Sequence, residues 1–79
     1  MYEDFFEIVG TVLQVSNPTR IGLSMENSRL GRSLIVKDDK GQNHFPCVFT
    51  DAPEIGKKYR FVIGVYFGFE DVVSMTEIY

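Results

Sequence analysis

The stretch that decides the fold runs from Ser33 to Thr50 and reads SLIVKDDKGQNHFPCVFT. Two runs with alternating apolar residues flank the turn sequence DDKG at positions 38–41. A glycine in such a turn suits the positive φ that many β-hairpins require. We therefore predict a hairpin built from two strands, Leu34–Asp38 and Asn43–Thr50.

Three further strands are predicted on either side of this hairpin. One alternating run precedes it at Phe6–Val15, and two runs follow it at Lys57–Val65 and Val72–Ile78. Gly10 inside the first run indicates a bend or a close approach of two backbones, and a bulge is expected near Leu13. Five strands with almost no helical periodicity in 79 residues predict a single all-β domain, residues 1–79, folded as a small barrel.

The longest segment without clear periodicity lies between the first two strands, from Asn17 to Arg32. Long irregular loops in small domains are usually functional or mobile. This segment contains three arginines and several side chains that form hydrogen bonds, Asn27 among them. Three alternatives are compatible with it: a ligand-contacting loop, a surface excursion without fixed structure, and a protruding β-hairpin that extends the first two strands.

Alternation also sorts the side chains of the strand Asn43–Thr50. It places Phe45, Cys47 and Phe49 together, toward the barrel interior. Pro46 cannot donate a hydrogen bond to a neighbouring strand, so it indicates a bulge or an unpaired edge. A register shift at that bulge would turn one ring outward, so Phe45 is a candidate for either side, whereas Phe49 and Cys47 are expected in the core.

Composition limits what this domain can do. Eight Lys and Arg against eleven Asp and Glu give a net charge of −3, which argues against a protein that holds duplex DNA mainly by neutralising phosphates. The single Cys47 excludes an intramolecular disulfide and a Cys-based zinc cluster. No apolar run is long enough for a membrane span, and the first residues lack the basic region of a signal peptide. The expected location is the cytoplasm, or the host cytoplasm if the gene is viral.

No catalytic constellation is visible in the sequence. One His, one Cys and scattered serines define no pair of nucleophile and base. Neither a glycine-rich phosphate loop nor a cluster with metal-ligand spacing is present. We therefore expect a binding protein rather than an enzyme, with no metal and no cofactor.

Short patterns follow one another in a fixed order along nearly the whole chain. They are Ile8-x-Gly10-x-Val12, Leu34-x-Val36-x-Asp38-x-x-Gly41, Phe49, Ile55-Gly56 and Val73-x-Met75-x-x-Ile78. Together they resemble the oligonucleotide/oligosaccharide-binding (OB) fold, and in particular the small single-stranded-DNA-binding proteins of phages and plasmids. Those proteins can lack the helix between the third and fourth strands, and Asp51–Glu54 is too short here for more than one helical turn.

The resemblance implies a five-stranded Greek-key barrel with a binding face on its second and third strands. The loop between strands one and two and the loop between strands four and five would frame that face. Binding of single strands needs rings for stacking and cations along the phosphates. Three rings surround Gly68, where a turn cannot bury all of them. The candidate nucleic-acid-binding residues are Arg20, Arg29, Arg32, Lys37, His44, Phe45, Lys58, Tyr66, Phe67 and Phe69.

The leading hypothesis is binding of single-stranded DNA, or alternatively RNA, with little sequence preference. So small a site would gain affinity from a homodimer or a cooperative array along the strand, and a replication protein is a further candidate partner. The rival hypothesis is a protein-interaction adaptor or inhibitor in which the segment Tyr66 to Phe69 serves as an apolar anchor. A barrel for a small ligand is a third alternative.

Overall fold

The described part of the chain consists of strands and connections, without a helix. The computed structural model describes residues 2–22, 24, 26 and 28–79. Within these residues there is no helix that could cross a membrane. The strands are β1 (Asp4–Val15), β2 (Thr19–Gly22), β3 (Ser28–Asp38), β4 (Asn43–His44), β5 (Cys47–Val48), β6 (Lys58–Tyr66) and β7 (Phe69–Glu77).

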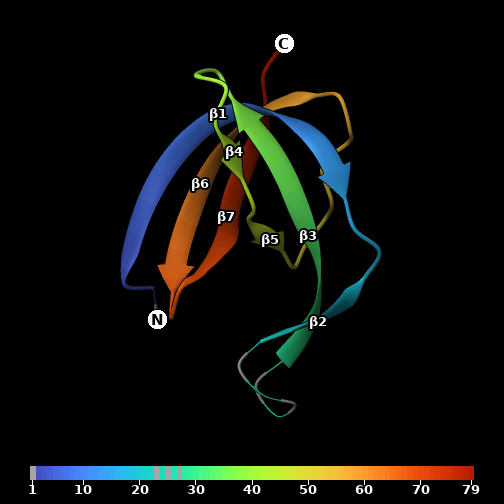
Figure 1. Ribbon diagram of the computed structural model, residues 1–79, viewed down its shortest axis with the longest axis vertical. Coiled ribbons are helices and arrows are strands. Elements are labelled where there is room, and N and C mark those ends of the chain that lie inside the picture. Colours follow the sequence, from blue (N-terminus) through green and yellow to red (C-terminus); the bar gives the residue numbers. More distant parts are fainter. Residues whose placement is uncertain (1, 23, 25, 27) are drawn as a thin grey trace.

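Five of these strands close into a barrel (Figure 1). β1 pairs with β6, β6 with β7, β7 with β5, β5 with β3, and β3 pairs again with β1. The β5–β7 pairing is parallel and the other four are antiparallel. With β2 and β4 as additional strands, this all-β architecture is consistent with the predicted OB-type barrel.

The core fills the inside of this barrel. Side chains from alternate positions of β3 and β6 point into it, as the period of two in the sequence predicts. Burying one such aliphatic or aromatic side chain stabilises the fold by about 1.5–3 kcal/mol. The largest fully buried side chains, each less than 2% exposed, are Val12, Leu34, Val36, Pro46, Val48, Phe61 and Ile63.

β1 curves around the barrel and pairs with both β6 and β3. A Cβ atom at Gly10 would lie 2.7 Å from the carbonyl oxygen of Lys37 and 2.8 Å from Cγ1 of Val36, so only glycine allows the two strands to approach this closely. The β1–β3 register shifts between Val12 and Gln14. Both the close approach and the bulge predicted for this strand are confirmed.

The segment from Asn17 to Arg32 forms most of a β-hairpin. β2 pairs antiparallel with the first part of β3, with Thr19 opposite Gly31. Figure 1 shows this hairpin extending away from the barrel. The hairpin alternative is thereby confirmed, and β3 is longer than the predicted strand Leu34–Asp38. Asn27, expected to add a polar side chain to this segment, lies outside the described residues.

The predicted strand Asn43–Thr50 is divided into β4 and β5. Pro46 lies between them and has no N–H to donate to a ladder. Its carbonyl oxygen accepts a hydrogen bond from the backbone N–H of Leu34, with N and O 2.8 Å apart. The interruption expected at Pro46 is therefore confirmed.

The prediction of which side chains of this strand face the core is wrong. In the β3–β5 pair, Val48 lies opposite Arg32 and is 1% exposed, so the core side carries Val48 rather than its neighbours. Cys47 and Phe49 lie on the outer side and are only partly buried, and Phe45 is 64% exposed. Pairing with β3 decides this phase, because the even-numbered side chains of β3 face the core.

Candidate functional site

The outer surface of β3, β4 and β5 carries the side chains that alternate with the core-facing ones along each strand. Lys37 lies opposite Asn43, and Ser33 lies opposite Cys47, so the same face continues from strand to strand. Alternation along β3 adds Arg29 to this face. We call this surface the groove face and define it by Arg29, Ser33, Lys37, Phe45, Cys47 and Phe49.

Two hollows lie along the groove face. The first, of about 560 Å³, is bounded by the β2–β3 hairpin and the start of β7, and the second, of about 530 Å³, lies beside β4. Cys47, Phe69 and Glu70 line both, so the two hollows are adjacent, and together we call them the groove. The first is also lined by Tyr2, Ile21, Glu26, Arg29, Phe49 and Asp71, and the second by Phe6, Asn43, His44 and Phe45.

Phe49 lies against the backbone of β3 within the first hollow. A Cβ atom at Gly31 would lie 2.6 Å from Cδ1 of the Phe49 ring, so the glycine provides the space that the ring occupies. The guanidinium carbon of Arg29 lies 4.1 Å from the centroid of the same ring, a cation–π contact. The prediction of a core Phe49 is wrong, and this residue was missed as part of the site. Because Gly31 falls in the segment without clear periodicity, the close approach of a ring to it could not be recognised from the sequence.

Other aromatic rings are exposed around the groove. Phe45 is 64% exposed, Phe67 60% and Tyr66 37%, whereas Phe69 is partly buried. At the β6–β7 turn both Phe67 and Gly68 have positive φ, 47° and 81°, as a two-residue hairpin turn requires. The Tyr66 and Phe67 rings meet edge to face with centroids 4.6 Å apart. The prediction that this turn leaves at least one ring exposed is confirmed.

The predicted arginines divide between the two faces of the β2–β3 hairpin. Arg29 lines the first hollow, and Lys37 is exposed on the groove face near the other end of β3. Arg20 and Arg32 occupy the opposite phase and therefore lie on the other face of the hairpin. Arg32 donates to the carbonyl oxygen of Ser16 at 2.9 Å. The structure thus brings Arg29 and Lys37 to the groove face, but not Arg20 and Arg32.

Lys58 belongs to a basic cluster on β6 that lies outside the groove. Its Nζ is 2.9 Å from Oδ1 of Asp39, and Nε of Arg60 is 3.3 Å from Oε1 of Glu7. Lys57 is paired with two glutamates. Exposed pairs of this kind contribute about 1 kcal/mol or less each, but they neutralise the densest group of cations in the chain.

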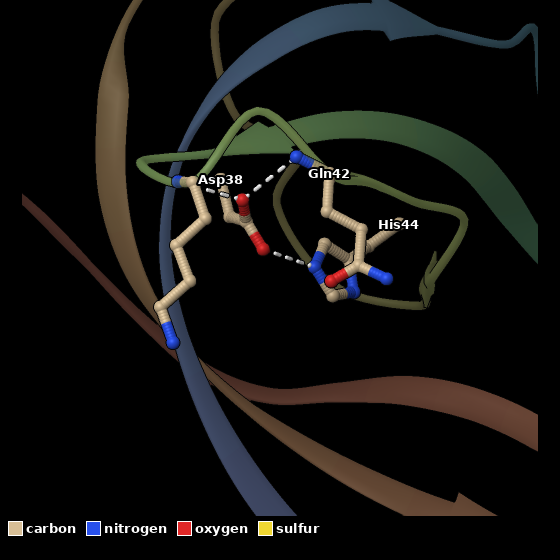
Figure 2. A network of polar contacts seen from close by, with 4 residues as sticks. Asp38, Gln42 and His44 are labelled. Carbon is tan, nitrogen blue, oxygen red and sulfur yellow. Dashed lines mark hydrogen bonds and ion pairs between the residues drawn. The ribbon is translucent and has the colours of Figure 1, made fainter.

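His44 anchors the β3–β4 turn. Its Nε2 lies 2.8 Å from Oδ2 of Asp38, while Oδ1 of Asp38 accepts hydrogen bonds from the backbone N–H groups of Lys40 and Gln42, at 2.9 Å each (Figure 2). These bonds, led by the one from His44, hold the pKa of Asp38 below its usual value. The His44 side chain is 18% exposed and borders the second hollow. The His44 side chain therefore contacts mainly Asp38 in the turn, and little of it is open to solvent.

Carboxylates also line the first hollow, a feature that the sequence reasoning missed. Glu26, Glu70 and Asp71 lie there, against one arginine among the described lining residues. The Tyr2 hydroxyl donates to Oδ2 of Asp71, and this bond raises the pKa of Tyr2. Cys47, opposite Asp71 in the parallel β5–β7 pair, has its thiol pKa raised mainly by burial.

Comparisons of the chain with protein-family models, with curated proteins and with solved structures gave no significant match. Within residues 2–22, 24, 26 and 28–79, no group of three or more His, Cys, Asp or Glu side chains is placed to hold a metal ion. The chemistry of the groove is that of its own side chains: aromatic rings, Arg29 and carboxylates, with the exposed Lys37 further along the groove face.

Proposed function

We propose that this chain binds single-stranded nucleic acid, preferentially DNA, along the groove face and with little sequence preference. The observation that supports this most directly is that two rings, Phe45 and Phe49, share one face with Arg29 and Lys37. The Phe45 ring is 64% exposed and is available for stacking, whereas Arg29 covers a face of the Phe49 ring, so Phe49 holds the guanidinium at the groove.

Stacking would supply most of the affinity. A base stacked on an aromatic side chain contributes about 1–3 kcal/mol, and every base has a face that can stack, which explains a low sequence preference. Phe67 and Phe69 offer further rings at the β6–β7 turn. The phosphates would follow Arg29 and Lys37, while the ion-paired cations on β6 take no part.

The segments that border the groove correspond to those that border the binding face in OB folds. The β2–β3 hairpin and the β6–β7 turn occupy the places of the two loops that frame the binding face of OB folds. A fold does not fix a function, so the proposal rests on the rings and charges of the groove face. A single site of this size would gain affinity from a homodimer or a cooperative array, and a replication protein is a candidate partner.

Fluorescence anisotropy with labelled oligo-dT, at low and at high salt, tests the proposal, and oligo-rU of equal length tests the preference for DNA. Phe45→Ala is expected to weaken oligo-dT binding about fivefold or more, since it removes one stacking ring. Ile55→Ala is the matched control, because Ile55 is 62% exposed and lines neither hollow. Absence of oligo-dT binding at micromolar protein in low salt would exclude the proposal.

The carboxylates of the first hollow favour a second candidate function. Glu26, Glu70 and Asp71 would suit a cationic segment of another protein, with the exposed Phe67 as an apolar anchor. A partner captured from nuclease-treated extract by the unmodified chain, but not by Phe67→Ala, would support this candidate.

A further inference from the structure

Glu70 lies at the boundary between the two hollows. It lines both hollows and lies between Phe69 and Asp71 at the start of β7. The residue is partly buried, and among the described residues no hydrogen bond or ion pair reaches its carboxylate. Asp71 differs in this respect, because the Tyr2 hydroxyl occupies one of its oxygens.

A free carboxylate is an unexpected group at the border of a groove proposed to hold a polyanion. Like charges repel, so Glu70 would weaken binding wherever a phosphate came near it. A carboxylate that accepts hydrogen bonds from its ligand has the opposite effect, and such charge-assisted hydrogen bonds are about twice as strong as neutral ones. Glu70 therefore favours ligands that present an N–H group toward β7.

The four bases differ in this property. Cytosine, adenine and guanine carry an exocyclic amino group that donates hydrogen bonds, and Glu and Asp side chains recognise the amino group at N4 of cytosine. Thymine presents the carbonyl oxygen O4 at the corresponding position, which would face the carboxylate with an acceptor. Bases of single strands are unpaired, so these edges are free to reach the protein.

We infer that Glu70 gives the groove a preference, at one nucleotide of the bound strand, for a base with an exocyclic amino group, cytosine above thymine. This inference rests on the proposed binding of single strands. The other nucleotides are bound through stacking and keep their tolerance of sequence. Glu70 is thus a specificity-determining residue within an otherwise permissive site.

The test compares labelled oligo-dC and oligo-dT of equal length by anisotropy, at mildly alkaline pH so that cytosine stays neutral. For the unmodified chain we expect oligo-dC to bind about tenfold more tightly than oligo-dT, in the range of a single good base contact. Glu70→Gln keeps the size of the side chain and is expected to bring this ratio close to one, partly by tightening oligo-dT. Glu7→Gln makes the same charge change on β1, outside both hollows, and should leave the ratio unchanged.

Each other outcome has a distinct meaning. Equal binding of both oligonucleotides by the unmodified chain overturns the inference and leaves the proposed function standing. A preference for oligo-dC that survives in Glu70→Gln, or that is lost equally in Glu7→Gln, also overturns the role of Glu70. Binding of neither oligonucleotide overturns the proposed function, and the inference with it. Circular dichroism of both variants verifies that they are folded.

Discussion

Two glycines position their neighbours because they lack a side chain. Gly10 lets β1 and β3 approach inside the barrel wall, and Gly31 lets the Phe49 ring lie on the backbone of β3. The first supports the fold, whereas the second supports the groove, since a ring without that space would have to move away from Arg29. Both effects follow from the distances that an added Cβ atom would have to its surroundings.

Gly10→Ala is expected to lower the free energy of unfolding by about 1–3 kcal/mol, the usual cost of overpacking a tight interior. The nearest atom that the new methyl group would meet is the backbone oxygen of Lys37, which cannot rotate out of the way. Thr11→Ala, at the next position and on the other face of β1, is the control. Chemical denaturation measures both variants, and equal, small losses would contradict the close approach.

Asp38→Asn is expected to lower the melting temperature at neutral pH. Because hydrogen bonds hold the pKa of Asp38 below its usual value, the ionised carboxylate stabilises the folded state at neutral pH. This contribution is complete above the ordinary aspartate pKa of 3.8 and is lost as the pH falls from there through the lowered value. Thermal unfolding across acidic and neutral pH should therefore show the difference between the two proteins narrowing below about pH 4. A difference that stays constant with pH would contradict this role, and Asp39→Asn serves as a neighbouring, more exposed control.

The β2–β3 hairpin is an element with two different faces. One face carries Arg29 toward the groove, and the other carries Arg20, Leu30 and Arg32 away from it. A protruding hairpin can therefore contribute to a binding site with only half of its side chains. This separation is visible only once β2 and β3 are paired, because the sequence alone does not show which face of the hairpin each arginine occupies.

Arg29→Ala and Arg20→Ala form a matched pair that tests the two faces. Both remove one guanidinium from the same hairpin and change the net charge equally. We expect Arg29→Ala to weaken oligo-dT binding about fivefold or more, through loss of a phosphate contact and of the cation–π support of Phe49. Arg20→Ala should change the affinity much less. Equal losses in anisotropy titrations would mean that only overall charge matters.

Strand positions could be predicted from sequence, whereas the side of one strand could not. Period-two alternation is a local property, so β1 and β6 were predicted close to their observed bounds, whereas β3 begins six residues earlier than predicted because it continues into the β2–β3 hairpin. The register with β3 is the same on both sides of Pro46, so the strand keeps one alternation throughout, but alternation alone does not decide which of the two faces points inward. Pairing between Arg32 and Val48 decides it, and that pairing links distant parts of the chain.

The same reason explains which parts of the candidate site were missed. Arg29, Lys37, Phe45 and the rings of the β6–β7 turn could be predicted as binding candidates from residue type and turn position. Glu70 and Asp71 enter the groove because β7 pairs with β5 in parallel, a contact between segments far apart in sequence. Charge neutralisation of Lys58 by Asp39 is likewise a contact between distant segments.

Across the whole molecule, charge is distributed unevenly between two surfaces. The cations of β6 are paired with carboxylates, whereas Arg29 lines the groove and Lys37 is exposed on the groove face. Each phosphate contact contributes about −0.7 to the slope of log affinity against log salt for single strands. Two contacts predict a shallow slope of about −1.4.

Anisotropy titrations of oligo-dT over a series of salt concentrations measure this slope. A shallow slope would agree with binding that depends mainly on stacking. A slope several times steeper would require many more phosphate contacts than the groove face offers. In that case the cations of β6 would have to leave their ion pairs and join the site.

The groove face as the binding surface is the central claim, and an NMR titration of isotope-labelled protein with oligo-dT tests it most directly. We expect the largest amide chemical-shift changes at Arg29, Phe45, Phe49 and Phe69, with little change on the β1–β6 surface around Arg60. Shift changes that cluster around Arg60, or none at saturating oligonucleotide, would contradict the claim.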